Sequence, residues 1–250
     1  MSRIIIMAYG LVCYVLGVAS LVLFILFANN HIGLLLPEYM SLGIDHANTA
    51  PTGPVMAFAI NVALIVLFGL QHTVMARQSF KSRLVALLPP AAERSTYVLM
   101  TAIVIMVMAQ YWQPMTGSIW LVENETARLV ITGIYYFGWA FTLAATYMLN
   151  HNHLFGLQQS FKPDDPDAGA KEFVTPMFYK VVRHPIQTGV LIAMVATPDM
   201  TVGRATLAVG MIVYILVGLH YEERDLITEF GDTYRDYMKR VGGLLPRFRH

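Results

Sequence analysis

A series of apolar stretches of membrane length constrains the fold of this chain more than any other feature. A helix needs about 20 mostly apolar residues to cross a bilayer. Four stretches meet this requirement, and a fifth region holds a short and a long apolar segment on either side of a Pro198-Asp199 turn: residues 4–28, 54–75, 95–111, 127–149 and 184–221. The pattern predicts an all-α, polytopic bundle of transmembrane helices whose last region is a helical hairpin.

The hairpin leaves the number of crossings open. Residues 186–197 are too few to cross a membrane at 1.5 Å per residue, so the first arm is short or tilted. The bundle has six crossings if this arm spans the membrane and five if it is re-entrant. In both cases we expect a single membrane domain over residues 1–250, ending in a tail over residues 222–250.

The composition supports this class. Hydrophobic residues make up 56% of the chain and charged residues only 13%, whereas a soluble domain carries about 25% charged residues. The net charge of +1 argues against nucleic acid as a partner, so the expected partners are the lipid bilayer and a small molecule. The single cysteine, Cys13, excludes a disulfide within the chain. No feature of the sequence indicates an oligomeric state.

Loop charge predicts the orientation. If the N-terminus lies inside, all 17 Lys and Arg residues except Arg128 and Arg204 fall on the inside. Positive residues concentrate in cytoplasmic loops. We therefore expect a protein of the bacterial inner membrane type, with both termini in the cytoplasm.

This topology brings the polar groups that carry chemistry to the cytoplasmic face. They lie at the inner ends of three predicted spans and at the start of the hairpin: His72, His151, His153, Arg183, His184, Glu222 and Glu223. Each also has a structural interpretation, because Arg183 alone could anchor a span and the glutamates could be a solvated helix exit. The histidines lack the tight spacing of metal ligands, and we predict no metal site.

The C-terminal pattern carries a resemblance. It reads Arg183-His184-Pro185-x-x-x-Gly189, then Glu222-Glu223 and Phe230-Gly231-x-x-Tyr234-x-x-Tyr237. This resembles the membrane methyltransferases typified by isoprenylcysteine carboxyl methyltransferase. The resemblance implies S-adenosyl-L-methionine in a cytoplasmic pocket formed by the hairpin and the tail. The cofactor-binding residues it implies are Tyr179, Arg183, His184, Pro185, Gly189, Glu222 and Glu223.

Three further segments are similar to the methanethiol S-methyltransferase family: Gln71-His72-Thr73-Val74-Met75-Ala76-Arg77, Pro89-Pro90-x-x-Glu93-Arg94-Ser95-Thr96-Tyr97 and Asn150-His151-x-x-Leu154-Phe155-Gly156. The similarity implies methylation of methanethiol to dimethyl sulfide, with hydrogen sulfide as a second acceptor. One departure is Gln187, where the wider superfamily often has tyrosine.

Elementary chemistry assigns roles to these residues. A guanidinium such as that of Arg183 pairs with the carboxylate of the cofactor, and Glu222 or Glu223 accepts from its ribose hydroxyls. A small thiol is mostly protonated at neutral pH, since cysteine-like thiols have a pKa of about 8.5. A base or thiolate stabiliser is then useful, and we predict His72, His151 or His153, in that order. The alternatives are a prenylcysteine carboxylate or lipid amine as acceptor, or a non-catalytic membrane accessory protein.

Overall fold

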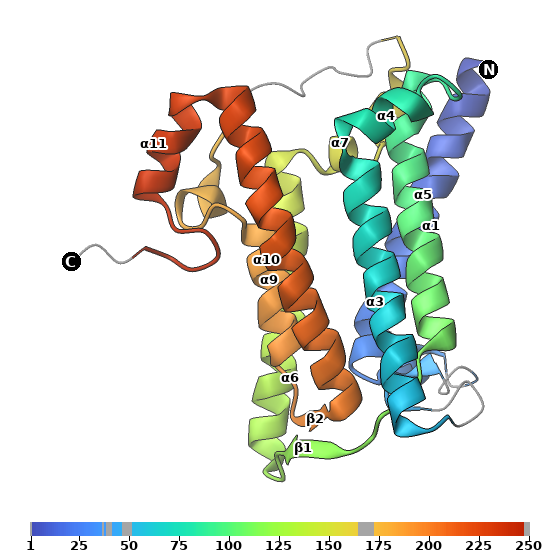
Figure 1. Ribbon diagram of the computed structural model, residues 1–250, viewed down its shortest axis with the longest axis vertical. Helices are drawn as coiled ribbons and strands as arrows, with labels where there is room; N and C mark the ends of the chain where they lie inside the picture. The colour runs from blue at the N-terminus through green and yellow to red at the C-terminus, as the bar shows by residue number, and fades with distance from the viewer. Residues whose placement is uncertain (1, 37, 39–41, 47–51, 165–172, 248–250) are drawn as a thin grey trace. The chain divides into compact units, whose positions relative to one another are not determined.

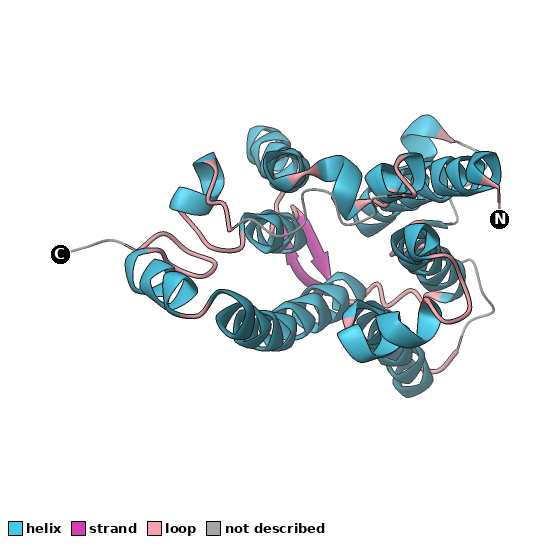
Figure 2. Ribbon diagram, turned by 90° about the horizontal axis from the view of Figure 1, so that it is seen from above, coloured by secondary structure: helices cyan, strands magenta, loops and turns pink. Residues whose placement is uncertain are grey.

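The computed structural model describes residues 2–36, 38, 42–46, 52–164 and 173–247. Lys171 and Arg249, two of the basic residues used to predict the orientation, lie outside these ranges. Helices make up nearly all the regular structure of the described residues (Figure 2). Two short strands, β1 (Ser118–Leu121) and β2 (Asp199–Thr201), pair with each other. The predicted all-α fold is confirmed.

Among the described residues, five helices are long and apolar enough to cross a membrane: α1 (Arg3–Ala28), α3 (Pro54–Ala76), α5 (Pro90–Tyr111), α6 (Glu125–Leu149) and α10 (Val202–Phe230). The chain is therefore an integral membrane protein. The first arm of the hairpin, α9 (Pro185–Val195), has 11 residues, or about 16 Å at 1.5 Å per residue. A hydrocarbon core is about 30 Å thick, so α9 is a short arm, as the sequence indicates.

The second arm differs from the prediction at its end. Helix α10 continues to Phe230, past the predicted end at Tyr221. Glu222 and Glu223 thus lie on a regular helix and not in a tail, which fixes the direction of their side chains. The remaining short elements are α2 (Ile32–Leu35), α4 (Gln78–Leu84), α7 (His151–Leu154), α8 (Leu157–Phe161), the 3₁₀ helix η2 (Met177–Lys180) and α11 (Asp232–Arg240).

The chain divides into two compact units. The first unit comprises residues 1–119, 152–170 and 200–207, and the second comprises residues 120–151, 171–199 and 208–250. In the first unit α5 packs against both α1 and α3, and α8 packs against α1 (Figure 1). A Cβ built on Gly17 would lie 2.4 Å from Val98 Cγ1, so the absence of a side chain there lets α1 approach α5 closely.

In the second unit α6 packs against α9 through two glycines. A Cβ built on Gly189 would lie 2.5 Å from the carbonyl oxygen of Gly138 and 2.3 Å from Thr142 Oγ1. Thr142 Oγ1 also donates to the carbonyl of Ile186 at 3.0 Å. The two backbones therefore touch, and a side chain at residue 189 would push the helices apart.

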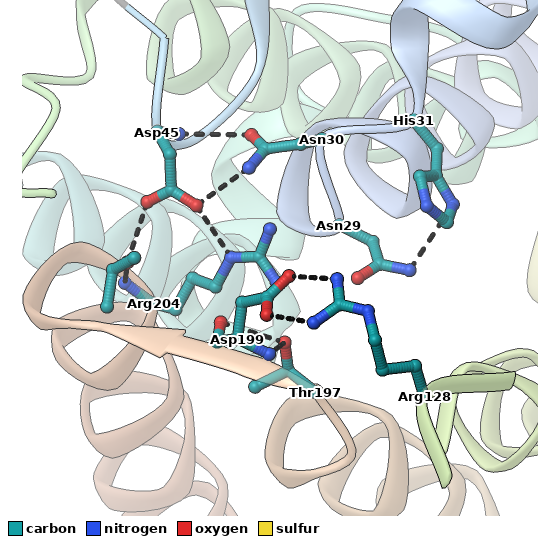
Figure 3. A network of polar contacts seen from close by, with 9 residues as sticks. Asn29, Asn30, His31, Asp45, Arg128, Thr197, Asp199 and Arg204 are labelled. Atoms are coloured by element: carbon teal, nitrogen blue, oxygen red, sulfur yellow. Dashed lines mark hydrogen bonds and ion pairs between the residues drawn. The ribbon is translucent and has the colours of Figure 1, made fainter. Parts of the chain in front are cut away.

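The loops of the first unit are tied by a buried ion pair (Figure 3). The Asp45 carboxylate accepts from Arg204 Nε at 2.8 Å, Asn30 Nδ2 at 2.7 Å and Thr201 Oγ1 at 2.6 Å. The Arg204 and Asp45 side chains are only 7% and 13% exposed. Both carboxylate oxygens have partners within the protein, so protein groups satisfy the Asp45 carboxylate.

The second unit has a more exposed ion pair, also drawn in Figure 3. Arg128 Nη1 and Nη2 donate to the two carboxylate oxygens of Asp199 at 2.5 and 2.7 Å. The two side chains are 32% and 31% exposed. This bidentate pair ties the start of α6 to the strand β2, but water competes for it.

Candidate active site

The Arg183-His184-Pro185 segment is held against the chain that follows α11. Val182 and Gly242 form a parallel β-bridge. The backbone N–H of Arg183 donates to Gly242 O at 2.8 Å, and that of His184 donates to Gly243 O at 3.2 Å. Helix α9 then begins at Pro185, where the missing N–H is not needed for helical bonding. The backbone therefore positions both side chains before α9 starts.

The Arg183 guanidinium is bonded entirely within the protein. Its Nε and Nη2 donate to Glu223 Oε1 at 2.9 and 2.6 Å. Its Nη1 donates to the carbonyl oxygens of Val241 and Met238. All three nitrogens thus have acceptors, and Arg183 links α10 to the segment after α11. The structure accounts for Arg183 as a cross-link, whereas the sequence predicts it as a ligand for a carboxylate.

The two glutamates have different environments. Glu223 is 20% exposed, and its Oε1 accepts from Arg183 and also lies 3.0 Å from His184 Nε2. Glu222 is 48% exposed and lies 3.9 Å from His184 Nδ1, with Gln187 Nε2 at 3.5 Å. Glu223 is therefore committed to the internal network, and Glu222 is the carboxylate that a ligand can reach.

A cluster of aromatic side chains joins Phe173 to α11 and to the end of α10. The Phe173 ring contacts the rings of Phe230, Tyr234 and Tyr237 at centroid distances of 5.3 to 5.9 Å. The hydroxyl of Tyr237 donates to the carbonyl oxygen of Tyr179, and burial raises the pKa of Tyr237 to about 12. The bond from Tyr237 ties α11 to η2, and the ring contacts pack Phe173 against α11 and the end of α10.

Tyr234 provides a buried hydroxyl. The residue is 2% exposed, and within the described residues its hydroxyl has no hydrogen-bond partner. Burial, and after it the charge of Glu223, raises the pKa of Tyr234. Burial and the charge of Glu222 likewise raise the pKa of Tyr179. Both phenols stay protonated at neutral pH, and Tyr234 can donate to a ligand.

His151 belongs to the same unit. Its Nδ1 lies 2.9 Å from Thr146 Oγ1, and its ring stacks on Tyr147 at 4.2 Å. The Thr146 hydroxyl donates to Leu143 O at 2.7 Å, so it accepts from Nδ1. The hydrogen of the neutral ring is therefore on Nδ1, and Nε2 is the basic atom. Burial lowers the pKa of His151, which keeps it neutral at pH 7.

His72 and His153 belong to the first unit. His72 Nε2 lies 2.6 Å from the Tyr97 hydroxyl, and Nδ1 lies 3.5 Å from Thr101 Oγ1. The Thr101 hydroxyl donates to the carbonyl oxygen of Tyr97 at 3.0 Å, so it accepts from Nδ1. Tyr97 then donates to Nε2. The carbonyl oxygen of His153 accepts from Gln159 Nε2 at 3.1 Å.

Comparison with known proteins shows similarity along most of the chain. The chain is 38% identical over 247 residues to methanethiol S-methyltransferase 2 of Bradyrhizobium diazoefficiens. The matched region covers 98% of this chain and 92% of that protein. It is 44% identical over 197 residues to the methanethiol S-methyltransferase of Pseudomonas deceptionensis, covering 78% and 74%. It is 40% identical over 235 residues to that of Mycobacterium tuberculosis, covering 92% and 94%.

This chain belongs to the methanethiol S-methyltransferase family. The resemblance seen in the sequence is confirmed, and the family consists of S-methyltransferase enzymes by name. No protein-family model matches the chain, and no solved structure matches it.

In this family member the predicted residues fall into two sets. The second unit brings together Tyr179, Arg183, His184, Pro185, Gly189, Glu222 and Glu223, with His151 in the same unit. Pro185 and Gly189 are buried by packing, and the contact of α9 with α6 explains Gly189 without a ligand. The described residues hold no group of three His, Cys, Asp or Glu side chains arranged for a metal.

Sequence reasoning missed two hydroxyl groups in this methyltransferase. Tyr97, the hydrogen-bond partner of His72, stands at the end of a segment quoted for the family resemblance, but nothing local marks it as the partner of a residue on another helix. Tyr234 stands in the C-terminal motif quoted for the resemblance, without a role for its hydroxyl. Its unpartnered hydroxyl is a consequence of burial, which the sequence does not state.

Proposed function

We propose that this chain transfers a methyl group from S-adenosyl-L-methionine to methanethiol, giving dimethyl sulfide, with hydrogen sulfide as a second acceptor. The observation that carries this proposal is the similarity to methanethiol S-methyltransferases over nearly the whole chain. Because the match includes both units, it favours this reaction over a prenylcysteine carboxylate or a lipid amine as acceptor, and over a non-catalytic role.

The second unit suits the cofactor in part. The exposed Glu222 carboxylate fits the ribose hydroxyls, and the buried Tyr234 hydroxyl offers a donor. Arg183 fits the carboxylate of the cofactor less well, since its three nitrogens already have acceptors. We therefore assign Arg183 and Glu223 to holding the pocket together. S-adenosyl-L-methionine, when bound, supplies a methyl group on a positively charged sulfur.

Activation of the thiol is assigned to His72. A thiol with a pKa of about 8.5 is mostly protonated at pH 7, and the thiolate is the nucleophile. Since the Tyr97 hydroxyl donates to His72 Nε2, the thiol proton would pass to the Tyr97 oxygen as the Tyr97 proton passes to Nε2. The thiolate sulfur then accepts the methyl group. His151, with Nε2 as its basic atom, is the second candidate, and His153 is the third.

The orientation of the protein is also a proposal. Only Arg128 and Arg204 lie outside in the topology with cytoplasmic termini, so we place the termini and the site in the cytoplasm. This location gives the site direct access to cytoplasmic S-adenosyl-L-methionine. A reporter fused after residue 250 that is active only in the periplasm would contradict it.

A headspace assay tests the reaction. Purified protein with S-adenosyl-L-methionine is given methanethiol, hydrogen sulfide or a prenylcysteine analogue, and dimethyl sulfide and methanethiol are measured in the gas phase. We expect product from the two small thiols. Turnover by His72→Ala should fall by roughly 10²–10⁴, the usual scale for acid–base help, and recover in part at high pH. Methylation of the prenylcysteine analogue alone would refute the proposal.

A further inference from the structure

The amide of Gln71 adjoins the His72 cluster in the first unit. Gln71 Nε2 donates to Thr101 Oγ1 at 3.4 Å and lies 3.2 Å from Met75 Sδ. Thr101 is also the residue whose hydroxyl oxygen lies 3.5 Å from His72 Nδ1. Gln71 and His72 therefore share one acceptor, on α5.

The surroundings fix which way the Gln71 amide points. The Met75 sulfur has no hydrogen to donate, and the Thr101 hydroxyl already donates to the carbonyl oxygen of Tyr97 at 3.0 Å. An inverted amide would place the Gln71 oxygen against two acceptors. The nitrogen must therefore face Thr101 and Met75, and the oxygen faces away from them.

That oxygen has no donor. Gln71 Oε1 is buried, and within the described residues it has no hydrogen-bond partner. A buried acceptor left without a donor costs about 1–3 kcal/mol, so an unsatisfied group next to a proposed base points to a ligand that brings its own hydrogen.

The chemistry of the neighbours limits that ligand. Met75, Tyr97 and Val98 form a buried apolar cluster against which Phe80, Leu84 and Phe155 pack. A buried carbonyl acceptor beside this apolar cluster suits a small, neutral donor, and it disfavours a carboxylate because the lone pairs of the carbonyl repel negative charge. A thiol is a weak S–H donor with a polarisable sulfur of the kind that packs against methionine and aromatic rings.

We infer that Gln71 Oε1 accepts the S–H of the acceptor thiol and so marks the binding site for methanethiol and hydrogen sulfide. The inference rests on the proposed function and deepens it, since it names the group that binds the protonated substrate. Gln71 acts before the proton leaves, so it determines affinity for the thiol more than the rate of methyl transfer.

The test compares a ligand that has an S–H with one that lacks it. In Gln71→Leu we expect the KM for methanethiol to rise roughly five- to ten-fold, with kcat changed less than about three-fold. Dimethyl sulfide has no S–H, so its inhibition constant should stay the same or decrease in Gln71→Leu. A KM for methanethiol that rises while the inhibition constant of dimethyl sulfide does not is the signature of a lost hydrogen bond to the thiol.

Gln159→Leu is the matched control. Gln159 lies in the same unit, and its Oε1 is also buried with no partner among the described residues. Its Nε2 donates to the backbone of His153 and not to the His72 cluster. We expect wild-type constants for this variant. Thermal unfolding of both variants checks the fold, and Gln71→Met replaces Gln71→Leu if the latter does not fold.

Several outcomes would overturn the inference. An unchanged KM in Gln71→Leu would mean that only water occupies the site. Equal losses of affinity for methanethiol and dimethyl sulfide would indicate a change of shape, and the same losses in Gln159→Leu would indicate a general effect on the unit. A wild-type protein that makes no dimethyl sulfide refutes the proposed function itself. An active wild type whose KM for methanethiol is unchanged in Gln71→Leu refutes only this inference.

Discussion

The two buried arginine–carboxylate pairs, Arg204–Asp45 in the first unit and Arg183–Glu223 in the second, are similar in geometry and differ in what stands beside them. Arg204 Nε donates to Asp45, and all three guanidinium nitrogens of Arg183 have acceptors within the protein. Both oxygens of Asp45 have partners within the protein. Next to Glu223, however, stands Glu222, which is 48% exposed. A buried arginine in a family motif is therefore no proof of a ligand contact, and the accessible neighbour is the better guide.

The largest effect is expected from Asp45→Asn. Removing one partner of a buried ion pair leaves the other charge uncompensated, which costs about 3–5 kcal/mol. The free energy of unfolding in detergent micelles should decrease by this amount. Asp199→Asn, in the exposed pair with Arg128, is the control and should change stability much less. Equal losses of stability in the two variants would contradict the distinction between the buried and the exposed ion pair.

A smaller loss of stability is expected from Glu223→Gln. The change weakens the bonds to Arg183 and His184, and hydrogen bonds to charged groups contribute about 1.5–3 kcal/mol. Residues 238–247 should then exchange their amide hydrogens faster, because Arg183 also holds the carbonyls of Met238 and Val241. Unchanged exchange there would show that Arg183 does not fix this segment.

Glu222→Gln should separate binding from stability. The polar contacts of its side chain are long, at 3.5 Å to Gln187 and 3.9 Å to His184, so unfolding should be nearly unaffected. Affinity for S-adenosyl-L-methionine, measured by calorimetry, should weaken by about 1–3 kcal/mol if Glu222 accepts from the ribose. If Glu222→Gln binds normally while a folded Glu223→Gln does not, the two glutamates have the opposite roles.

The smallest expected effect is on the pH dependence of stability, through His31. Burial and the charge of Arg204 lower the pKa of His31 below its usual 6.5. The folded state therefore binds a proton less readily than the unfolded chain, and the stability contributed by neutral His31 is present above about pH 6.5 and lost as the pH falls. His31→Gln should reduce the difference between unfolding midpoints at about pH 7.5 and about pH 5. An identical difference in both proteins would contradict this.

Hydropathy predicts the existence of the long apolar helices, but it does not predict where α10 ends. The apolar pattern stops at Tyr221, whereas the helix continues to Phe230. Backbone hydrogen bonding is indifferent to side-chain charge, so the helix extends through Glu222 and Glu223 after the apolar signal has ended. Hydropathy indicates where a chain can enter lipid, and it does not locate the end of a helix that leaves it.

The motif predicts which residues lie together but does not assign their hydrogen-bond partners. Arg183, His184, Glu222 and Glu223 do lie together, as their pattern indicates. The acceptors of Arg183 Nη1 come from residues 238–241, more than 50 positions later in the chain. His72 likewise takes its hydroxyl partner from Tyr97 on the next long helix. Such pairings depend on tertiary packing, which a single sequence pattern does not contain.

The bonds from Arg183 to the carbonyls of Met238 and Val241 also join parts of the chain that are synthesised at different times. The ribosome synthesises residues 238–243 after the residues of α9 and α10. Until those residues emerge, the Arg183 guanidinium lacks two acceptors and its backbone lacks the bridge to Gly242. The site is therefore completed only after these residues have left the ribosome, and a chain truncated before residue 238 would contain both arms of the hairpin but lack these acceptors.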